Sequence, residues 1–84
     1  MKYSKQAWDQ IRSVTSEELC TAAKRDGAVE EKSKGATRGY RFPDGRRLVI
    51  HWHPGKSYRP GLLKGLLDDA GWTEADLKRL KLIK

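Results

Sequence analysis

The sequence has few of the residues that small proteins use for cross-links or membrane anchoring. Its 84 residues include one cysteine, Cys20, so neither an intrachain disulfide nor a paired-cysteine zinc site can form. Asparagine is absent, which excludes N-glycosylation. No apolar run is long enough to cross a bilayer. The opening residues MKYSKQAWDQ contain no hydrophobic signal region, and we therefore expect a cytoplasmic protein with no membrane contact.

The length predicts one domain, residues 1–84. A chain of this size buries only about 60–65% of the surface that it exposes when unfolded. It can form one small core but no enclosed catalytic chamber. Any active site should therefore be a shallow site on the surface.

All of the net charge of +7 lies in the central residues 34–64. This segment has eight basic side chains and one acidic one, whereas residues 1–33 and 65–84 each have equal numbers of both signs. Arginine predominates there, and its planar guanidinium group suits phosphate oxygens. The placement predicts contact with a polyanion such as RNA. The candidate RNA-binding residues are Lys34, Arg38, Arg41, Arg46, Arg47, Lys56 and Arg59.

Spacing of apolar residues and capping signals predict seven elements in the order α-α-β-β-β-α-α. An extra N-terminal helix is expected over about 4–13, a core over about 15–71, and a last helix over about 73–81. Between the helices lie one weak, charged strand at 28–33 and two stronger strands. The order indicates an α+β fold, with a three-stranded antiparallel sheet packed on helices.

The two stronger strands should form a hairpin around the sequence FPDGR, residues 42–46. A type I turn with a bulge at the glycine places Thr37 opposite His51. Alternation then directs Leu48, Ile50 and Trp52 toward the helices. The open face carries Thr37, Arg41, Arg47, His51 and His53. A two-residue Asp-Gly turn is the alternative, and it would put Arg38 opposite His51.

The sequence His51-Trp52-His53 offers two imidazoles on one face of a strand. A neutral imidazole is a competent general base near pH 7, and RNA brings its own nucleophile in the 2′-hydroxyl. His51, with His53 as a second candidate, could therefore support ribonuclease chemistry without a metal or another cofactor. The alternative is that both histidines only end a strand. A metal site would need a further ligand, and the surrounding residues are cationic.

Several motifs in order resemble the HicA toxin family of bacterial type II toxin–antitoxin systems. They are YRFPDGRR at 40–47, His-Pro-Gly-Lys at 53–56, Pro-Gly-Leu-Leu at 60–63 and Asp-Ala-Gly at 69–71. The resemblance implies a double-stranded-RNA-binding-domain-like α-β-β-β-α fold. It also implies action on mRNA and neutralisation by a HicB-like antitoxin.

One departure from that family concerns the catalytic residue. The family carries Gly-Ser-His after the lysine, with the histidine as its catalytic group, whereas this chain reads Gly35-Ala36-Thr37. Threonine is not a base near neutral pH. Either catalysis is lost, or His51 replaces the missing group from the neighbouring strand. Three hypotheses therefore remain: a HicA-like ribonuclease using His51, a non-catalytic RNA-binding domain, and an interaction module for an acidic protein.

Overall fold

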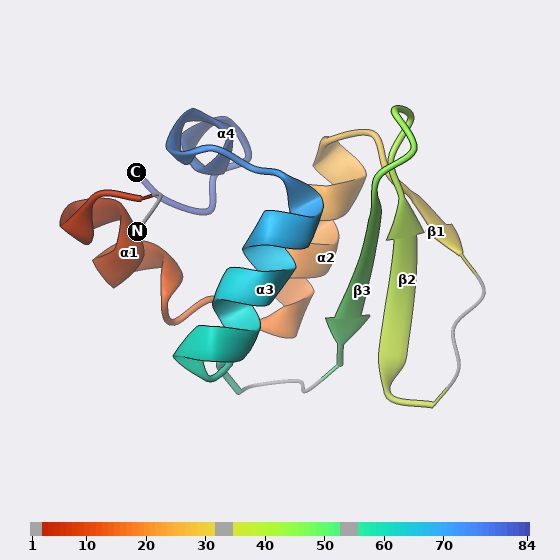
Figure 1. Ribbon diagram of the computed structural model, residues 1–84, viewed down its shortest axis with the longest axis horizontal. Helices are drawn as coiled ribbons and strands as arrows, with labels where there is room; N and C mark the ends of the chain where they lie inside the picture. Colours follow the sequence, from red (N-terminus) through yellow and green to blue (C-terminus); the bar gives the residue numbers. More distant parts are fainter. Residues whose placement is uncertain (1–2, 32–34, 53–55) are drawn as a thin grey trace.

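The computed structural model describes residues 3–31, 35–52 and 56–84. It confirms the α+β class and the order of elements (Figure 1). The short strand at 28–33 is confirmed for its described part, as an edge of three residues. The elements are α1 (Lys5–Ile11), α2 (Ser16–Arg25), β1 (Val29–Glu31), β2 (Thr37–Arg41), β3 (Arg47–His51), α3 (Pro60–Ala70) and α4 (Glu74–Arg79).

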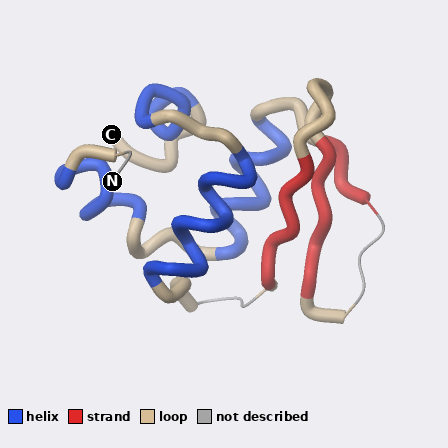
Figure 2. The backbone as a smooth tube through the Cα atoms, in the orientation of Figure 1, coloured by secondary structure: helices blue, strands red, loops and turns tan. Residues whose placement is uncertain are grey.

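The elements form layers, and the sheet is the outermost of them (Figures 1 and 2). Its strands are antiparallel in the order β1-β2-β3. Helices α2 and α3 both pack on one face of the sheet, and α1 and α4 lie beyond these two helices. No helix in the described part of the chain covers the opposite face, which we call the open face.

Local sequence signals determine where the helices begin and end. Thr15 caps α2 and Thr73 caps α4, and both form complete capping boxes. Pro60 occupies the first turn of α3, where its missing N–H costs nothing. Gly71 ends α3 in the left-handed conformation, at φ 68°. These signals determine where α2 and α4 begin and where α3 begins and ends.

The turn between β2 and β3 has the expected geometry. The amide of Gly45 donates to the Phe42 carbonyl over 3.0 Å, and the Phe42 amide donates to the Arg46 carbonyl over 2.9 Å. Gly45 has φ 95°, a conformation that favours glycine. The resulting register pairs Thr37 with His51 and confirms the type I turn with a bulge over the Asp-Gly alternative.

The helix-facing side of the sheet and the helices share one core. Tyr40, Leu48 and Ile50 are each at most 1% exposed, so burying each aliphatic side chain contributes about 1.5–3 kcal/mol. Ala22 and Ala23 of α2 are fully buried, and their small size lets this helix approach the sheet closely. As expected for a small apolar residue, Cys20 is also buried.

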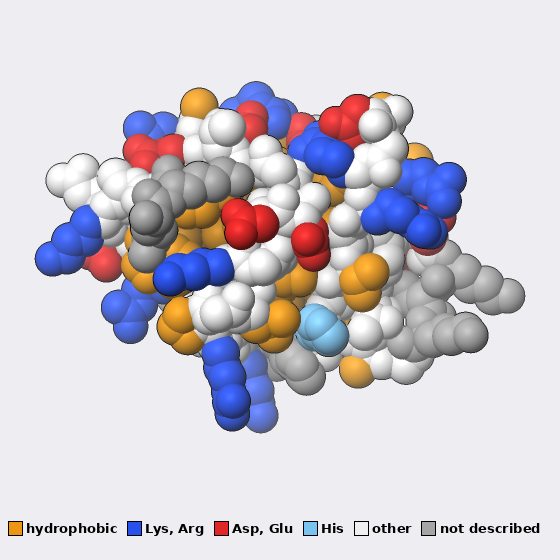
Figure 3. Space-filling view, viewed as in Figure 1, with side chains coloured by type: hydrophobic (Ala, Val, Ile, Leu, Met, Phe, Trp, Pro, Cys, Tyr) orange, Lys and Arg blue, Asp and Glu red, His pale blue; other side chains and the backbone are white. Residues whose placement is uncertain are grey.

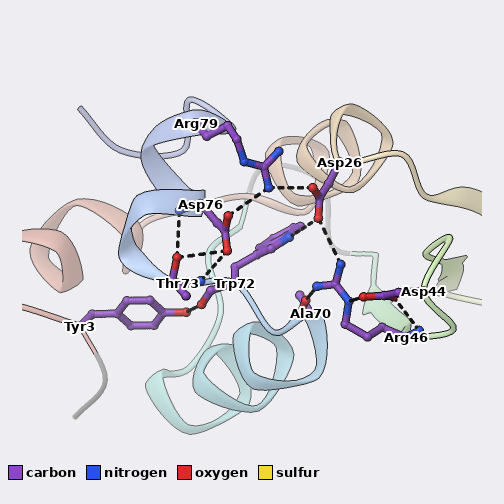
Figure 4. A network of polar contacts seen from close by, with 9 residues as sticks. All are labelled: Tyr3, Asp26, Asp44, Arg46, Ala70, Trp72, Thr73, Asp76 and Arg79. Atoms are coloured by element: carbon purple, nitrogen blue, oxygen red, sulfur yellow. Dashed lines mark hydrogen bonds and ion pairs between the residues drawn. The ribbon is translucent and has the colours of Figure 1, made fainter.

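The Asp26 carboxylate joins four parts of the fold (Figure 4). It follows α2 and accepts hydrogen bonds from Trp72 Nε1 at 2.9 Å and Arg79 Nη2 at 2.7 Å. Arg46 Nη2 lies 3.6 Å from the same carboxylate. The Arg46 guanidinium also donates to the carbonyl of Ala70. Asp26 thereby holds the hairpin turn, the end of α3 and helix α4 against the end of α2.

The N-terminal segment is attached to the same region. The Tyr3 hydroxyl donates to the Trp72 carbonyl at 2.6 Å, as Figure 4 shows, and the Ser4 amide donates to Glu74 Oε1 at 2.8 Å. Burial, with a smaller contribution from Asp68 and Asp76, raises the pKa of Tyr3 from 10.0 to about 12. The docked tyrosine therefore resists ionisation in the folded protein.

We expect Asp26→Ala to lower the free energy of unfolding by about 2–4 kcal/mol, because it leaves the buried indole N–H of Trp72 without its acceptor and removes an ion-pair partner from both Arg46 and Arg79. Urea denaturation followed by circular dichroism measures the change. Asp69→Ala, at an exposed position of α3, serves as the control and should leave the midpoint nearly unchanged. Equal midpoints for both variants would contradict the role of Asp26.

Tyr3 should also contribute to the pH dependence of stability. Its folded pKa lies above its unfolded value, so its contribution is complete below pH 10 and is lost as the pH rises toward about 12. Tyr3→Phe should therefore be less stable than the wild type at pH 8 and lose less stability between pH 8 and pH 11. Thermal unfolding at the two pH values tests this, and equal losses in both proteins would show that the Tyr3 hydroxyl has no such effect.

Candidate nucleic-acid interface

Alternate residues of the three strands point toward the open face and form rows across the sheet. The register of both strand pairs defines these rows. The row nearest the hairpin turn is Val29, Arg41 and Arg47; the middle row is Glu31, Gly39 and Val49; the far row is Thr37 and His51.

At the hairpin end, Glu31 pairs with two arginines at once. Its Oε2 lies 3.1 Å from Arg41 Nη2, and its Oε1 lies 3.0 Å from Arg47 Nη2. The arginine side chains remain 57% and 63% exposed. Figure 3 shows basic and acidic side chains side by side over this part of the sheet. The two guanidinium groups are thus neutralised in part but still accessible to solvent.

At the far end, Thr37 lies directly opposite His51. The hydrogen-bonded pairs alternate along the hairpin, from Phe42–Arg46 to Ala36–Trp52. The Thr37–His51 pair therefore belongs to the closer, non-hydrogen-bonded kind, with Cα atoms about 4.5 Å apart. His51 is partly exposed, and its carbonyl accepts a hydrogen bond from the buried Tyr58 hydroxyl at 2.7 Å. The partly exposed histidine thus lies directly beside Thr37 on the open face.

The two ends of the face are well separated. Arg47 and His51 are four residues apart on β3, which places their Cα atoms about 13 Å apart. Gly39 and Val49 lie between them, and Val49 is 51% exposed. A strand of RNA lying along this face could contact the guanidinium groups at one end and the imidazole at the other.

Two of the other predicted RNA-binding arginines do not lie on the open face. Arg38 is on the helix-facing side, with Cζ 4.1 Å from the centre of the Trp52 ring and Nη1 3.7 Å from Glu30 Oε1. Arg46 belongs to the Asp26 network and stacks on the Phe42 ring at 4.4 Å. Arg38 and Arg46 therefore contact groups of the protein itself, away from the open face.

The remaining predicted residues follow the sheet or are not described. Lys56 and Arg59 are exposed, and neither forms an ion pair with another described residue; Arg59 is the N-cap of α3. Lys34 and His53 lie outside the described residues, so their predicted roles stay predictions.

Sequence reasoning missed the pairing of Glu31 with the arginines. It treated the first 33 residues as a neutral part, whereas Asp26, Glu30 and Glu31 fold back onto arginines of the central segment. Alternation along the edge strand places Glu31 on the same face as Arg41. This alternation predicts the ion pair only when the register of β1 against β2 is known, and no tight turn fixes that register.

Other kinds of site find little support in the part of the chain that the structure describes. No group of three or more His, Cys, Asp or Glu side chains is placed to bind a metal ion there. None of the described helices has the length and apolarity to cross a membrane. Burial raises the pKa of the Cys20 thiol, which opposes formation of a reactive thiolate.

The fold and this face define a small α+β protein with an α-β-β-β-α core, formed by α2, the sheet and α3, and an uncovered sheet face that carries arginine and histidine. A family model described as the HicA toxin of bacterial toxin–antitoxin systems matches residues 16–72. This is more than half of the chain, which therefore belongs to the HicA toxin family. Helices α1 and α4 lie outside the matched range. A search of curated proteins gave no significant match.

Proposed function

We propose that the protein is a metal-independent endoribonuclease toxin that cleaves mRNA in the cytoplasm and is neutralised by a HicB-like antitoxin. Membership of the HicA toxin family supports a ribonuclease. The observation that carries the proposal is the position of His51, partly exposed on the open face and opposite Thr37. A base is thereby available beside the position where the family carries its catalytic histidine.

The chemistry requires only a base, a proton donor and cationic groups. In the proposed reaction, His51 accepts the proton of a 2′-hydroxyl, and the oxygen attacks the adjacent phosphorus. The bond from phosphorus to the 5′-oxygen breaks, and the leaving oxygen takes a proton from solvent. The products are a 2′,3′-cyclic phosphate and a free 5′-hydroxyl. No step needs a metal ion.

Positive charge on and beside the open face would hold the RNA backbone. In this proposal Arg41 and Arg47 bind phosphate at the hairpin end, about 13 Å from the imidazole. Lys56 and Arg59 add charge beyond the end of β3. The arginines would thus anchor the strand away from the bond that is cleaved, which differs from a clamp on the reacting phosphate itself.

A second function is favoured by the threonine at position 37. If His51 does not replace the family histidine, the same face would bind RNA without cleaving it. Both functions predict RNA binding that weakens as salt is added, with a slope set by the number of phosphates contacted. They differ only in whether the bound RNA is cut.

We expect His51→Ala to reduce RNA cleavage in EDTA by about 10²- to 10⁴-fold, the usual contribution of a general base, while RNA binding changes little. Gel analysis of a long RNA measures cleavage. Adding Thr37→His to the variant restores a histidine on the opposite strand and should recover part of the activity. A wild type that never cuts RNA, or a His51→Ala variant as active as wild type, would exclude catalysis by His51.

Gly39 offers a test of where the RNA lies. A Cβ atom at this position would lie 3.8 Å from Glu31 Cβ, an ordinary van der Waals contact, so the backbone leaves room for a Cβ atom there. Gly39→Val should keep or raise the stability, because valine favours strands, yet obstruct the middle of the open face. We expect RNA affinity to fall at least about threefold with an unchanged melting temperature; unchanged affinity would place the RNA elsewhere.

A further inference from the structure

We infer that Glu31 occupies the phosphate site of Arg41 and Arg47 in the free protein and competes with RNA for it. The inference rests on the proposed RNA contact at the open face and adds an internal competitor to it. One Glu31 oxygen contacts Arg41, and the other contacts both Nε and Nη2 of Arg47, at 3.2 and 3.0 Å. A single carboxylate therefore bridges both guanidinium groups.

The geometry suits exchange of a carboxylate for a phosphate. Guanidinium forks bind either anion through pairs of N–H donors. In this site two oxygens of one group already receive donors from two arginines on neighbouring strands. Two non-bridging oxygens of a phosphodiester can make the same contacts. No rearrangement of β2 or β3 is required, because only the Glu31 side chain has to turn away.

The ion pairs are weak enough to be displaced. Both arginine side chains are more than half exposed, and Glu31 is 31% exposed. Ion pairs in such surroundings contribute little, because water and salt screen them. The pair in the Asp26 network is different, since that carboxylate is only 11% exposed and also accepts from Trp72. A ligand can therefore displace the Glu31 contacts on the open face more easily than the Asp26 contacts.

Competition by the Glu31 carboxylate should make this site select between single phosphate groups and extended phosphate chains. A single anion gains only the contacts that Glu31 already makes, and it must also displace the Glu31 carboxylate, which is tethered to the same sheet. A polyanionic strand adds further contacts along the face and beyond β3, and these can offset the loss of the internal pair. Glu31 thus favours extended phosphate chains over single phosphate groups.

The test compares Glu31→Gln with Asp69→Asn, which removes the same charge from an exposed position of α3. Binding is measured by fluorescence anisotropy with a short 2′-O-methyl RNA, which lacks the nucleophile and cannot be cut. We expect Glu31→Gln to bind about two- to tenfold more tightly than wild type, as expected for the loss of two exposed ion pairs, and Asp69→Asn to stay within about twofold. Adding Arg47→Ala to Glu31→Gln should remove the gain.

A second measurement separates this inference from the proposed function. Inorganic tripolyphosphate is titrated while the Arg47 Nε–H signal is followed by NMR, and Glu31→Gln should bind it more tightly than wild type. If neither protein binds RNA but this difference is seen, Glu31 competes with phosphate at the arginines, and the RNA function is wrong. If RNA binds equally to both proteins, the inference is overturned and the RNA function stands. Weaker binding by Glu31→Gln would also overturn the inference. In that case the Glu31 carboxylate would hold the two arginines in position to bind phosphate instead of competing with it.

Discussion

The Asp26 carboxylate is the contact on which the arrangement of the other elements depends. It lies just after α2 and accepts donors from Trp72 and Arg79, while Arg46 brings the hairpin turn to the same group. Removing this carboxylate would leave the buried indole N–H without its acceptor and would weaken the attachment of both arginines. The hairpin is therefore held by its turn against the helices, which leaves the opposite face of its strands free. In the described part of the chain, the face with His51 is uncovered because α2 and α3 both pack on the other side of the sheet.

The distribution of charge gives the two kinds of arginine different roles. Arg46 is structural, because its guanidinium contacts Asp44 in the turn, Asp26 after α2 and the Ala70 carbonyl at the end of α3. Arg41 and Arg47 are exposed and paired with one acid. The first kind stabilises the fold, and the second can exchange partners. A net charge counted along the sequence does not distinguish the two kinds of arginine. The basic segment therefore predicted an interface, but not which of its arginines lie on the open face.

Much of the fold could be predicted from local signals. Residues 42–46 predicted a type I turn with a bulge that places Thr37 opposite His51, and the structure confirms this register over the two-residue alternative. In the same way, capping boxes predicted where α2 and α4 begin, and the proline and glycine around α3 predicted both ends of that helix. The structural role of Arg46 could not be predicted, because its partners Asp26 and Ala70 are distant in sequence. The pairing of Glu31 required the register of β1, which no short turn determines.

The central claim is that RNA contacts the open face of the sheet. Mapping of backbone amide shifts by NMR, with a 2′-O-methyl RNA added to isotope-labelled protein, tests it most directly. The account predicts that the largest shifts fall on β2, β3 and the residues around Lys56, while α1 and α4 stay unchanged. Shifts concentrated on α1 and α4, with the signals of Arg47, Val49 and His51 unmoved, would contradict it.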